Sequence, residues 1–148
     1  MTVDLSNLLC YRLFFVVKAN EQLIDKHMAP LHLNRTQWKV IARFNFLPMP
    51  CTQQHLLASM GIDRAHLTRT LEQLEQKSLI RKERQLGDKR AYTITLTQKG
   101  QAILEAVEKI LKMESDSVEV GLSATEKSIF KELINKIEAN ILNALEPS

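Results

Sequence analysis

The chain has 148 residues, of which 45% are hydrophobic and 25% charged, and its formal net charge is +3. This length is close to that of one domain and is enough for a hydrophobic core without disulfides or a metal ion. The apolar runs are far too short for a membrane span and the N-terminus lacks the basic start of a secretory signal, so we expect one cytoplasmic domain over residues 1–148. Cys10 and Cys51 do not have metal-ligand spacing, and neither a metal nor a cofactor is expected.

The first predicted element is a long helix over residues 4–28, because leucine, isoleucine and valine recur there at spacings of three and four. Pro30 marks the end of this helix. Asn34 or Thr36 can cap a second helix, which stops near Pro48. Both helices lie before the most informative part of the chain.

Residues 52–99 place two helices and a charged hairpin in direct succession. A short third helix is capped by Thr52, Gly61 supplies a turn, and a fourth helix is capped by Asp63 and runs to about Gln76. This order of elements is typical of a helix-turn-helix.

The hairpin is predicted from two short strands at residues 78–84 and 91–95, with residues 85–90 as the tip between them. Ile80 and Ile94 are expected to turn inward, while the charged side chains of the hairpin stay in water. Helix, turn, helix and hairpin together predict a winged helix-turn-helix.

Two more helices complete a mostly α fold of six helices with a small β-hairpin wing. One follows Thr97, and the last begins at a capping box that opens with Ser123. The first and last helices carry more apolar surface than a helix-turn-helix could cover. We therefore predict that residues 1–30 and 101–148 are the dimerisation helices of a homodimer, around a DNA-binding lobe of residues 33–99. Packing of the two ends on each other within one chain is the alternative.

The charge is uneven along the chain. Residues 64–99 carry nine Lys/Arg and four Asp/Glu, a balance of +5, whereas residues 100–148 carry five and nine, a balance of −4. The basic excess coincides with the predicted fourth helix and hairpin. This coincidence favours double-stranded DNA as the partner over an ordinary solvated charged surface.

The fourth helix has two contrasting sides on a helical wheel, because three leucines fall on one side and polar residues on the other. Arg69 can make the two-point contact with guanine, and Thr68 can reach a phosphate or a base edge. Small Ala65 permits close approach, while Arg64 and His66 flank the first turn, where backbone N–H groups favour phosphate. A solvated surface arginine is the alternative for Arg69.

The predicted wing tip contains the residues for a minor-groove contact. Gly87 allows a tight bend, and Arg90 fits a narrow minor groove, where the negative potential is strongest. Asp88 is expected to hold Arg90 or a neighbouring base in position. The cations expected to neutralise phosphates are Arg81, Lys82, Arg84 and Lys89. Their alternative role is the polar face of an ordinary hairpin.

The stretch LTRTLEQLEQKSLIRKERQLGDKRAYTITLTQKG resembles the helix-to-wing signature of the MarR family of bacterial transcriptional regulators, and APLHLNRTQWKVIARFNFLP resembles its SlyA branch. Asp88 and Arg90 match an Asp-x-Arg wing motif, and the residues from Leu96 to Gly100 match Leu-Thr-x-x-Gly. One departure is Ser78, where the family usually has glycine; it concerns the local bend rather than the fold.

The resemblance implies a homodimer held by its N- and C-terminal helices, which binds pseudo-palindromic operators and is often released by small phenolic or aromatic acids. By position, it implies that Arg69 reads a base and that Arg90 is the minor-groove arginine. It leaves open whether the protein is a repressor or an activator.

An effector site is expected between the dimerisation helices and the DNA-binding lobe. Arg12 lies on the apolar face of the first helix and can pair with a carboxylate, and His32 and Trp38 can complete an aromatic wall. The alternatives are an ion pair of Arg12 with the partner subunit, a surface or capping role for His32, and core packing for Trp38.

Cys10 is a second candidate for regulation. The string NLLCYRLFF resembles the peroxide-sensing branch of the same family, in which a cysteine of the first helix is oxidised. That branch uses tyrosines further along the chain, where this sequence offers Trp38 and no tyrosine. A redox role for Cys10 therefore stands beside that of a small buried apolar residue.

These features predict a sequence-specific DNA-binding transcriptional regulator of MarR/SlyA type. The alternatives are an architectural DNA protein with little sequence preference and a steep salt dependence, and a winged-helix protein-interaction module, which would not need so basic a surface. An enzyme is not expected, because no Gly-rich phosphate loop, metal-binding His pair or Ser–His arrangement appears.

Overall fold

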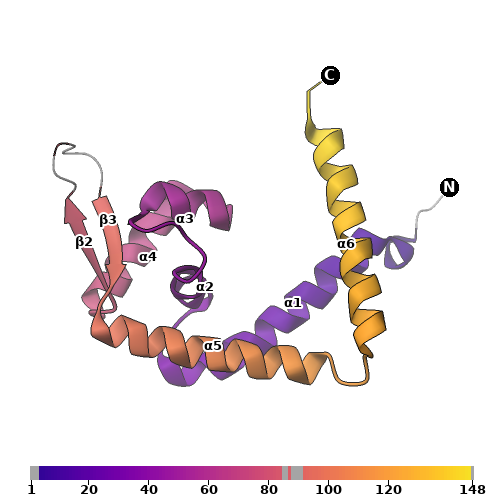
Figure 1. Ribbon diagram of the computed structural model, residues 1–148, viewed down its shortest axis with the longest axis horizontal. Helices are drawn as coiled ribbons and strands as arrows, with labels where there is room; N and C mark the ends of the chain where they lie inside the picture. The colour runs from indigo at the N-terminus through magenta and orange to yellow at the C-terminus, as the bar shows by residue number, and fades with distance from the viewer. Residues whose placement is uncertain (1–3, 85–86, 88–91, 148) are drawn as a thin grey trace. The chain divides into compact units, whose positions relative to one another are not determined.

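The structure, a computed structural model, describes residues 4–84, 87 and 92–147 (Figure 1). These residues form six α-helices, two 3-10 helices and three strands. The chain forms two compact units, Met1–Glu114 and Ser115–Ser148.

Helix α1 spans Leu9–Met28, so it begins later than the sequence pattern predicts. Before it, the Asp4 carboxylate accepts a 3.0 Å hydrogen bond from the Ser6 backbone N–H and caps a separate 3-10 helix, η1 (Leu5–Asn7). Leu8 is extended between the two helices. A local side-chain bond of this kind competes with α-helical pairing, which accounts for the break.

A tight turn leads from α1 into helix α2 (Arg35–Arg43). The 3-10 helix η2 (Ala29–Leu31) ends at His32, whose φ of 55° is left-handed. Asn34 then caps α2 in a capping box: its side chain accepts a 2.9 Å bond from the Gln37 backbone N–H, and Gln37 Oε1 accepts a 3.1 Å bond from the Asn34 N–H. Of the two predicted caps, Asn34 is therefore the one used.

Helices α3 (Gln53–Met60) and α4 (Arg64–Gln76) form the helix-turn-helix. Thr52 caps α3 and Asp63 caps α4, as predicted. Gly61 ends α3 with a φ of 62°, a conformation that glycine adopts without steric cost.

Three strands form an antiparallel sheet in the order β1-β3-β2: β1 (Cys51–Thr52), β2 (Ile80–Arg84) and β3 (Tyr92–Leu96). The β2–β3 pairing runs from Ile80 opposite Leu96 to Arg84 opposite Tyr92, which confirms the predicted hairpin. The sequence pattern does not predict β1, because two residues are too few to show alternation.

The turn between α4 and β2 depends on Ser78. Its φ is 59°, so the serine takes the left-handed conformation that glycine favours, and β2 starts at Ile80 rather than at residue 78. The Ser78 N–H donates a 2.8 Å bond to the Glu75 carbonyl, and the Leu79 N–H donates a 3.0 Å bond to the Leu74 carbonyl. The bend therefore forms without glycine.

Helix α5 (Gln98–Val118) starts at a close approach between two backbones. The Thr97 hydroxyl accepts a 2.9 Å hydrogen bond from the Gly100 N–H. A Cβ atom at Gly100 would lie 1.9 Å from the backbone oxygen of Leu79, so only glycine fits. This contact gives the Leu-Thr-x-x-Gly motif a physical reason.

In the first unit, α2, α3, α4 and the hairpin gather beside the N-terminal part of α5 (Figure 1). Their apolar sides form the core, whose largest fully buried members include Ile41, Leu56, Leu67, Leu71, Leu74, Ile80, Ile94 and Leu104. Helix α1 contributes only Ile24 and Met28 to the buried set, both from its C-terminal half. The N-terminal half of α1 therefore leaves most of its apolar side chains exposed, with Leu13 half-buried.

The second unit contains the end of α5 and helix α6 (Ala124–Leu145). Ser123 and Glu126 form the predicted capping box. No residue of α6 is buried, and its exposed apolar side chains include Phe130, Leu133, Ile134, Ile141 and Leu145. Among the helices that the structure describes, none is both long and apolar enough to cross a membrane.

Candidate DNA interface

Helix α4 is anchored to the core along one side. Leu67, Leu71 and Leu74 are fully buried, as the helical wheel predicts. Burial of a leucine side chain contributes roughly 1.5–3 kcal/mol, so three of them fix the rotation of the helix about its axis. Whatever lies on the opposite side is thereby presented to solvent in a defined orientation.

Arg64, Ala65 and Arg69 are exposed on that opposite side of α4. The Arg69 guanidinium forms no hydrogen bond or ion pair with the described residues, although its charge helps to lower the pKa of Asp63. Its guanidinium therefore keeps all five N–H donors for another molecule. Because Ala65 is small and lies one helical turn before Arg69, a nucleic-acid groove can approach closely here.

Thr68 is less available than the sequence suggests. Its hydroxyl accepts a 2.7 Å hydrogen bond from the Gln53 side-chain amide and donates a 2.8 Å bond to the Arg64 carbonyl. The hydroxyl proton is used, so in this arrangement Thr68 can accept one more hydrogen bond but cannot donate one to a phosphate. An amino group of a base is the matching partner.

His66 connects helix α4 to α2. Its Nε2 lies 3.2 Å from the Thr36 hydroxyl oxygen, and its backbone N–H donates a 2.8 Å bond to the Asp63 carboxylate. This backbone bond is the main reason why the pKa of Asp63 lies below its ordinary value. One of the N–H groups expected to bind phosphate is therefore occupied by the helix cap.

Arg64 has a partner on α3, because its Nη2 donates a 3.4 Å hydrogen bond to Gln54 Oε1. Gln53 and Gln54 are the site residues that sequence reasoning misses. Neither has a pattern of its own in the sequence, since each acts on a residue that lies at least ten positions further along.

The wing contributes further cations. Arg81 and Arg84 are exposed, and Arg84 lies 5.7 Å from the centre of the Tyr92 ring across the hairpin. Lys82 points back to α4, where its ammonium is 3.8 Å from Glu75 Oε2. Gly87 has a φ of 100°, in keeping with the tight bend predicted there. The other predicted tip residues, Asp88, Lys89 and Arg90, lie outside the described residues.

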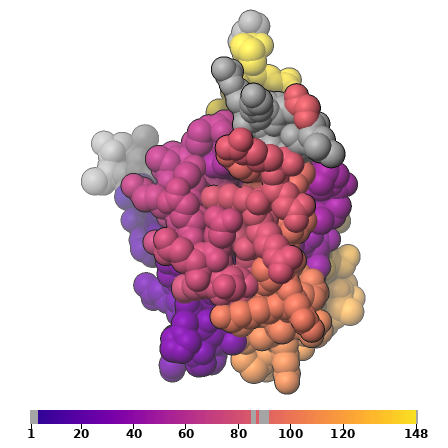
Figure 2. Space-filling view, turned by 90° about the vertical axis from the view of Figure 1, so that its left-hand side faces the viewer, coloured from indigo at the N-terminus to yellow at the C-terminus, as the bar shows by residue number. Residues whose placement is uncertain are grey.

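Figure 2 views the first unit from the side of the helix-turn-helix and β2, whose magenta to red surfaces adjoin without interruption. Exposed Arg64 and Arg69 from α4 and Arg81 and Arg84 from β2 supply positive charge to these elements. Exposed Glu72, Glu75 and Glu83 lie on the same two elements, so the positive charge is carried by individual arginines. Arginines on a helix and a hairpin are one feature of nucleic-acid-binding modules.

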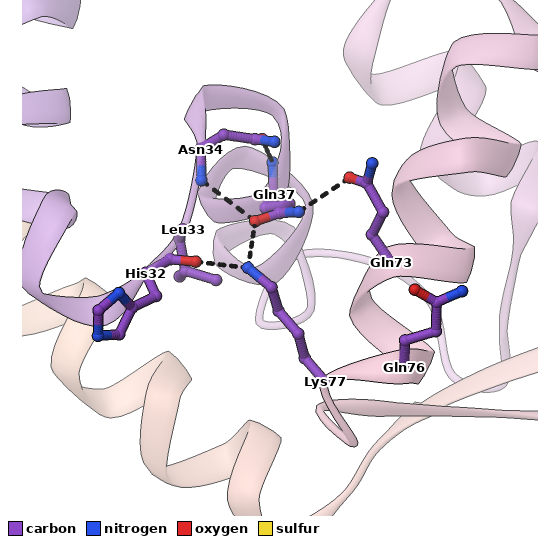
Figure 3. A pocket seen from close by; sticks show the side chains of 7 residues that line it. All are labelled: His32, Leu33, Asn34, Gln37, Gln73, Gln76 and Lys77. Atoms are coloured by element: carbon purple, nitrogen blue, oxygen red, sulfur yellow. Dashed lines mark hydrogen bonds between the residues drawn. The ribbon is translucent and has the colours of Figure 1, made fainter.

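The structure does not bring the predicted effector residues together. Arg12 is exposed on the N-terminal half of α1, and its guanidinium forms no hydrogen bond or ion pair with the described residues. Trp38 is buried in the core, where its indole N–H donates a 2.9 Å bond to Asp25 Oδ1. His32 is exposed and lines a different, polar pocket with Lys77 (Figure 3).

The two thiols differ in their surroundings. Cys10 is exposed in the first turn of α1 within the single chain. Cys51 is buried in β1, and burial raises the pKa of its thiol. Within the described ranges, no group of three or more His, Cys, Asp or Glu side chains could hold a metal ion.

Comparisons with known proteins agree with this architecture. The sequence model of the MarR family matches residues 33–92, which contain α2 through the start of β3. A solved structure, that of the transcriptional regulator PA3341, has 26% sequence identity to this chain and a TM-score of 0.82. The match covers 92% of this chain and 99% of PA3341.

Two further solved structures share the fold at lower identity. A MarR-family regulator from Listeria monocytogenes, solved with a 26mer DNA, has 19% identity and a TM-score of 0.80 over 93% of this chain and 91% of its own. The transcriptional regulator SlyA has 18% identity to this chain and a TM-score of 0.80, and the match covers 90% of this chain and 93% of SlyA. The MarR family model matches the helix-turn-helix and the hairpin, and the fold is shared over nearly the whole length of these regulators, so the chain is similar to MarR-family regulators throughout.

Proposed function

We propose that this protein is a sequence-specific transcriptional regulator that binds pseudo-palindromic operator DNA as a homodimer. One observation carries the proposal: the Arg69 guanidinium is exposed and makes no hydrogen bond to the described residues, on a helix whose other side is anchored by three buried leucines. MarR-family regulators are non-enzymatic DNA-binding proteins. Two proteins of the same fold, the Listeria regulator and MepR of S. aureus, were solved in complexes with DNA.

The mode of reading follows from the roles of the exposed groups. Helix α4 enters the major groove, where Arg69 donates to guanine O6 and N7 and Thr68 accepts from a base amino group. Arg64 and Arg84 contact phosphates. At the wing tip, Arg90 reaches the minor groove with Asp88 as its acceptor, and Lys89 neutralises a phosphate.

A second copy of the chain supplies the symmetry that a palindrome requires. In a dimer the two recognition helices lie roughly 34–36 Å apart, in successive major grooves. The exposed apolar side chains of η1 and α1, including Leu5, Leu9 and Val16, and those of α6 support a seam between subunits. Contiguous apolar surface of this kind marks an interaction site.

The dimer is tested by sedimentation at several protein concentrations. Val16→Glu and Ile141→Glu each place a charge on one of the two apolar faces and are expected to shift the protein to a monomer. Lys109→Glu, at an exposed position of α5, is the matched control. A monomeric parent protein at micromolar concentration would contradict the proposal.

Small aromatic acids are the proposed effectors. The exposed Arg12 guanidinium has no partner among the described residues and stands among the exposed apolar side chains of Leu8, Leu9 and Val16, so it can pair with a carboxylate whose ring packs beside it. Such a ligand weakens DNA binding only if it binds the two arrangements of the dimer with different affinities. Aryl acids that neither raise thermal stability nor weaken DNA binding, with Arg12→Ala as reference, would rule out this class.

The DNA-binding proposal is tested by selection from a random duplex pool at physiological salt, followed by sequencing. The expected result is a palindrome with half-sites one helical turn apart, and Arg69→Ala should lose the preference at one base pair of each half-site. Binding without enrichment, with an affinity that falls steeply with salt, would favour the architectural alternative.

A thiol-based switch is the second candidate function, favoured by the exposure of Cys10. Oxidation of a cysteine in α1 would place a polar or bulky group on the proposed dimer seam. Peroxide should then weaken operator binding by the parent protein and leave Cys10→Ser unaffected, whereas Cys51→Ser, at a buried thiol, is the control. Equal responses of the parent and Cys10→Ser would end this candidate.

A further inference from the structure

A pocket lined mostly by polar residues lies between the start of α2 and the end of α4, and one of these residues, Gln73, lies one helical turn beyond Arg69 (Figure 3). Its volume is about 460 Å³, which falls in the range of small-molecule sites. The lining residues are His32, Leu33, Asn34, Gln37, Gln73, Gln76 and Lys77. The lining holds one lysine and no carboxylate, so its fixed charge is positive.

The hydrogen bonds inside the pocket fix the orientation of its amides. Gln37, only 4% exposed, accepts at Oε1 from the Asn34 N–H and from Lys77 Nζ, at 3.1 and 2.9 Å. Its Oε1 must therefore face these two donors, and its Nε2 donates a 2.9 Å bond to Gln73 Oε1. Asn34 Oδ1 accepts from the Gln37 backbone N–H at 2.9 Å.

In this network the side-chain oxygen atoms accept hydrogen bonds, whereas several N–H donors have no acceptor. The side-chain oxygens of Asn34, Gln37 and Gln73 all have partners, whereas the amide nitrogens of Asn34 and Gln73 have none among the described residues. The Lys77 ammonium donates to Gln37 Oε1 and to the His32 carbonyl, and its third N–H has no protein acceptor in the described chain. A ligand that complements these groups carries oxygen acceptors and negative charge.

The rest of the lining selects for polar groups on the ligand. Apart from the His32 ring, no aromatic side chain lines the pocket, so it lacks the stacking surfaces that an aryl acid would use. The Gln76 side chain has no hydrogen bond to the described residues, so its amide offers both a donor and an acceptor, which suits hydroxyl groups. Figure 3 shows Gln73, Gln76 and Lys77 arriving from the end of α4 and Asn34 and Gln37 from α2.

The pocket also includes a strained backbone. His32, whose carbonyl accepts from Lys77, has a φ of 55°, which is uncommon for a residue other than glycine. Strain of this kind persists where the surrounding structure holds it, and it clusters at binding sites. In this pocket the Lys77 bond to the His32 carbonyl is one of the contacts that hold it.

We infer that this pocket binds a hydroxylated organic anion, such as a sugar acid or a sugar phosphate, whose charged oxygens contact Lys77, Asn34 and Gln73. The ligand would connect α2 to the last turn of the recognition helix. Binding of the anion depends only on the residues of the pocket, whereas any effect of the anion on transcription rests on the proposed DNA-binding function.

The test is a titration of the isotope-labelled full-length protein by two-dimensional NMR at constant ionic strength, without DNA. Gluconate and glucose-6-phosphate are the probes, because they distinguish a carboxylate from a phosphate source. Glucose, which has hydroxyl groups but no charge, is the control for the charge. Benzoate, which has a carboxylate but no hydroxyl groups, is the control for the hydroxyl groups. The expected result is that one or both probes shift the side-chain amide signals of Asn34, Gln37, Gln73 and Gln76, and that glucose and benzoate do not.

Lys77→Met is expected to weaken binding about tenfold or more, since it removes the charged donor. Lys109→Met removes the same charge from an exposed position of α5 and should leave affinity unchanged. Gln76→Leu, at an exposed side chain without described hydrogen bonds, should weaken binding several-fold without affecting the fold.

Three results would overturn the inference. The first is equal affinity of the parent, Lys77→Met and Gln76→Leu. The second is benzoate shifting the same signals as strongly as gluconate. The third is that operator DNA shifts these amide signals while neither small anion does, which would make the pocket a contact for the DNA backbone.

Discussion

The side-chain amide of Gln53 donates a 2.7 Å hydrogen bond to the hydroxyl of Thr68, and this bond joins the first residue of α3 to the exposed face of α4. The same hydroxyl donates to the Arg64 carbonyl one turn earlier. The angle between the two helices of the helix-turn-helix is thus supported at the surface as well as in the core. Thr68 serves the DNA interface partly by holding its neighbours in place.

Thr68→Val is expected to lower the free energy of unfolding by about 0.5–1.5 kcal/mol, because the Gln53 amide loses its acceptor. Thr68→Ser keeps the hydroxyl and should stay closer to the parent protein. Urea unfolding followed by circular dichroism measures both. If the serine variant lost as much stability as the valine variant, the hydrogen bond would not be the cause.

Arg69→Ala is expected to lower operator affinity by about 1–3 kcal/mol and to relax the preference at one base pair in each half-site. The physical reason is the loss of a two-point donor with no partner in the described part of the protein. Arg81→Ala is the matched control, since Arg81 is exposed on β2 and should contribute only to phosphate binding. Fluorescence anisotropy on the operator and on single-base variants measures the difference. Equal losses on all sequences would show that Arg69 does not read a base.

Local signals in the sequence predict the DNA-binding lobe well. Thr52 and Asp63 cap their helices, Gly61 makes the turn, and the leucine stripe of α4 is buried, because each of these features depends on residues a few positions apart. Strand β1 is not predictable in this way, since its two residues form a strand only through pairing with β3, more than forty positions later.

The same limit applies to the candidate sites. The Thr36–His66 contact and the Gln37–Gln73–Lys77 network join residues at least thirty positions apart, and no periodicity marks them. Trp38 illustrates the reverse case: an aromatic residue suggests a ligand wall in the sequence, whereas the structure gives its N–H to Asp25. Long-range partners decide what a polar or aromatic side chain has left to offer a ligand.

Ser78→Gly is expected to stabilise the protein by about 0.5–1 kcal/mol, because a left-handed conformation costs serine more than glycine. The observed φ of 59° supplies the strain that glycine would relieve. Ser78→Val should have the opposite effect, since a β-branched side chain tolerates this conformation least. Thermal unfolding compares the three proteins. A glycine variant less stable than the parent would mean that the serine side chain contributes more than its strain costs.

Acid should weaken the attachment of α1 to α2. The hydrogen bond from Lys39 is the main reason why the pKa of Glu21 lies below its ordinary value of 4.5. Burial alone would raise the pKa of Asp25, but hydrogen bonds from Arg35 and Trp38 outweigh burial and hold it below 3.8. A carboxylate whose pKa is lower in the folded than in the unfolded protein stabilises the fold at a pH above its unfolded pKa. This stabilisation is lost as the pH falls through its folded pKa.

The urea midpoint, measured from about pH 6 to about pH 3, should therefore fall as the carboxylates are protonated. Asp25→Asn should be less stable than the parent at the upper end and show a weaker dependence on pH. Glu105→Gln, at an exposed position of α5, is the control and should keep the slope of the parent. An unchanged slope in Asp25→Asn would show that the Asp25 cluster does not contribute to the acid response.

Gly100→Ala tests the close approach between the start of α5 and the turn after α4. A Cβ atom at this position would lie 1.9 Å from the Leu79 oxygen and 3.2 Å from a side-chain carbon of Leu96, and the oxygen belongs to the backbone and cannot move aside alone. The Leu79 oxygen also accepts a 3.0 Å bond from the Thr97 N–H, so its displacement would break the link between β3 and the turn. Overpacking of this kind costs about 1–3 kcal/mol.

Thermal unfolding should show this loss for Gly100→Ala and none for Gln101→Ala, which adds no atoms to the contact and lies on the exposed side of the same helix. Because this turn leads directly into β2 of the wing, the alanine variant should also lose operator affinity. If the alanine variant had the stability and the operator affinity of the parent protein, the two backbones would not be in contact.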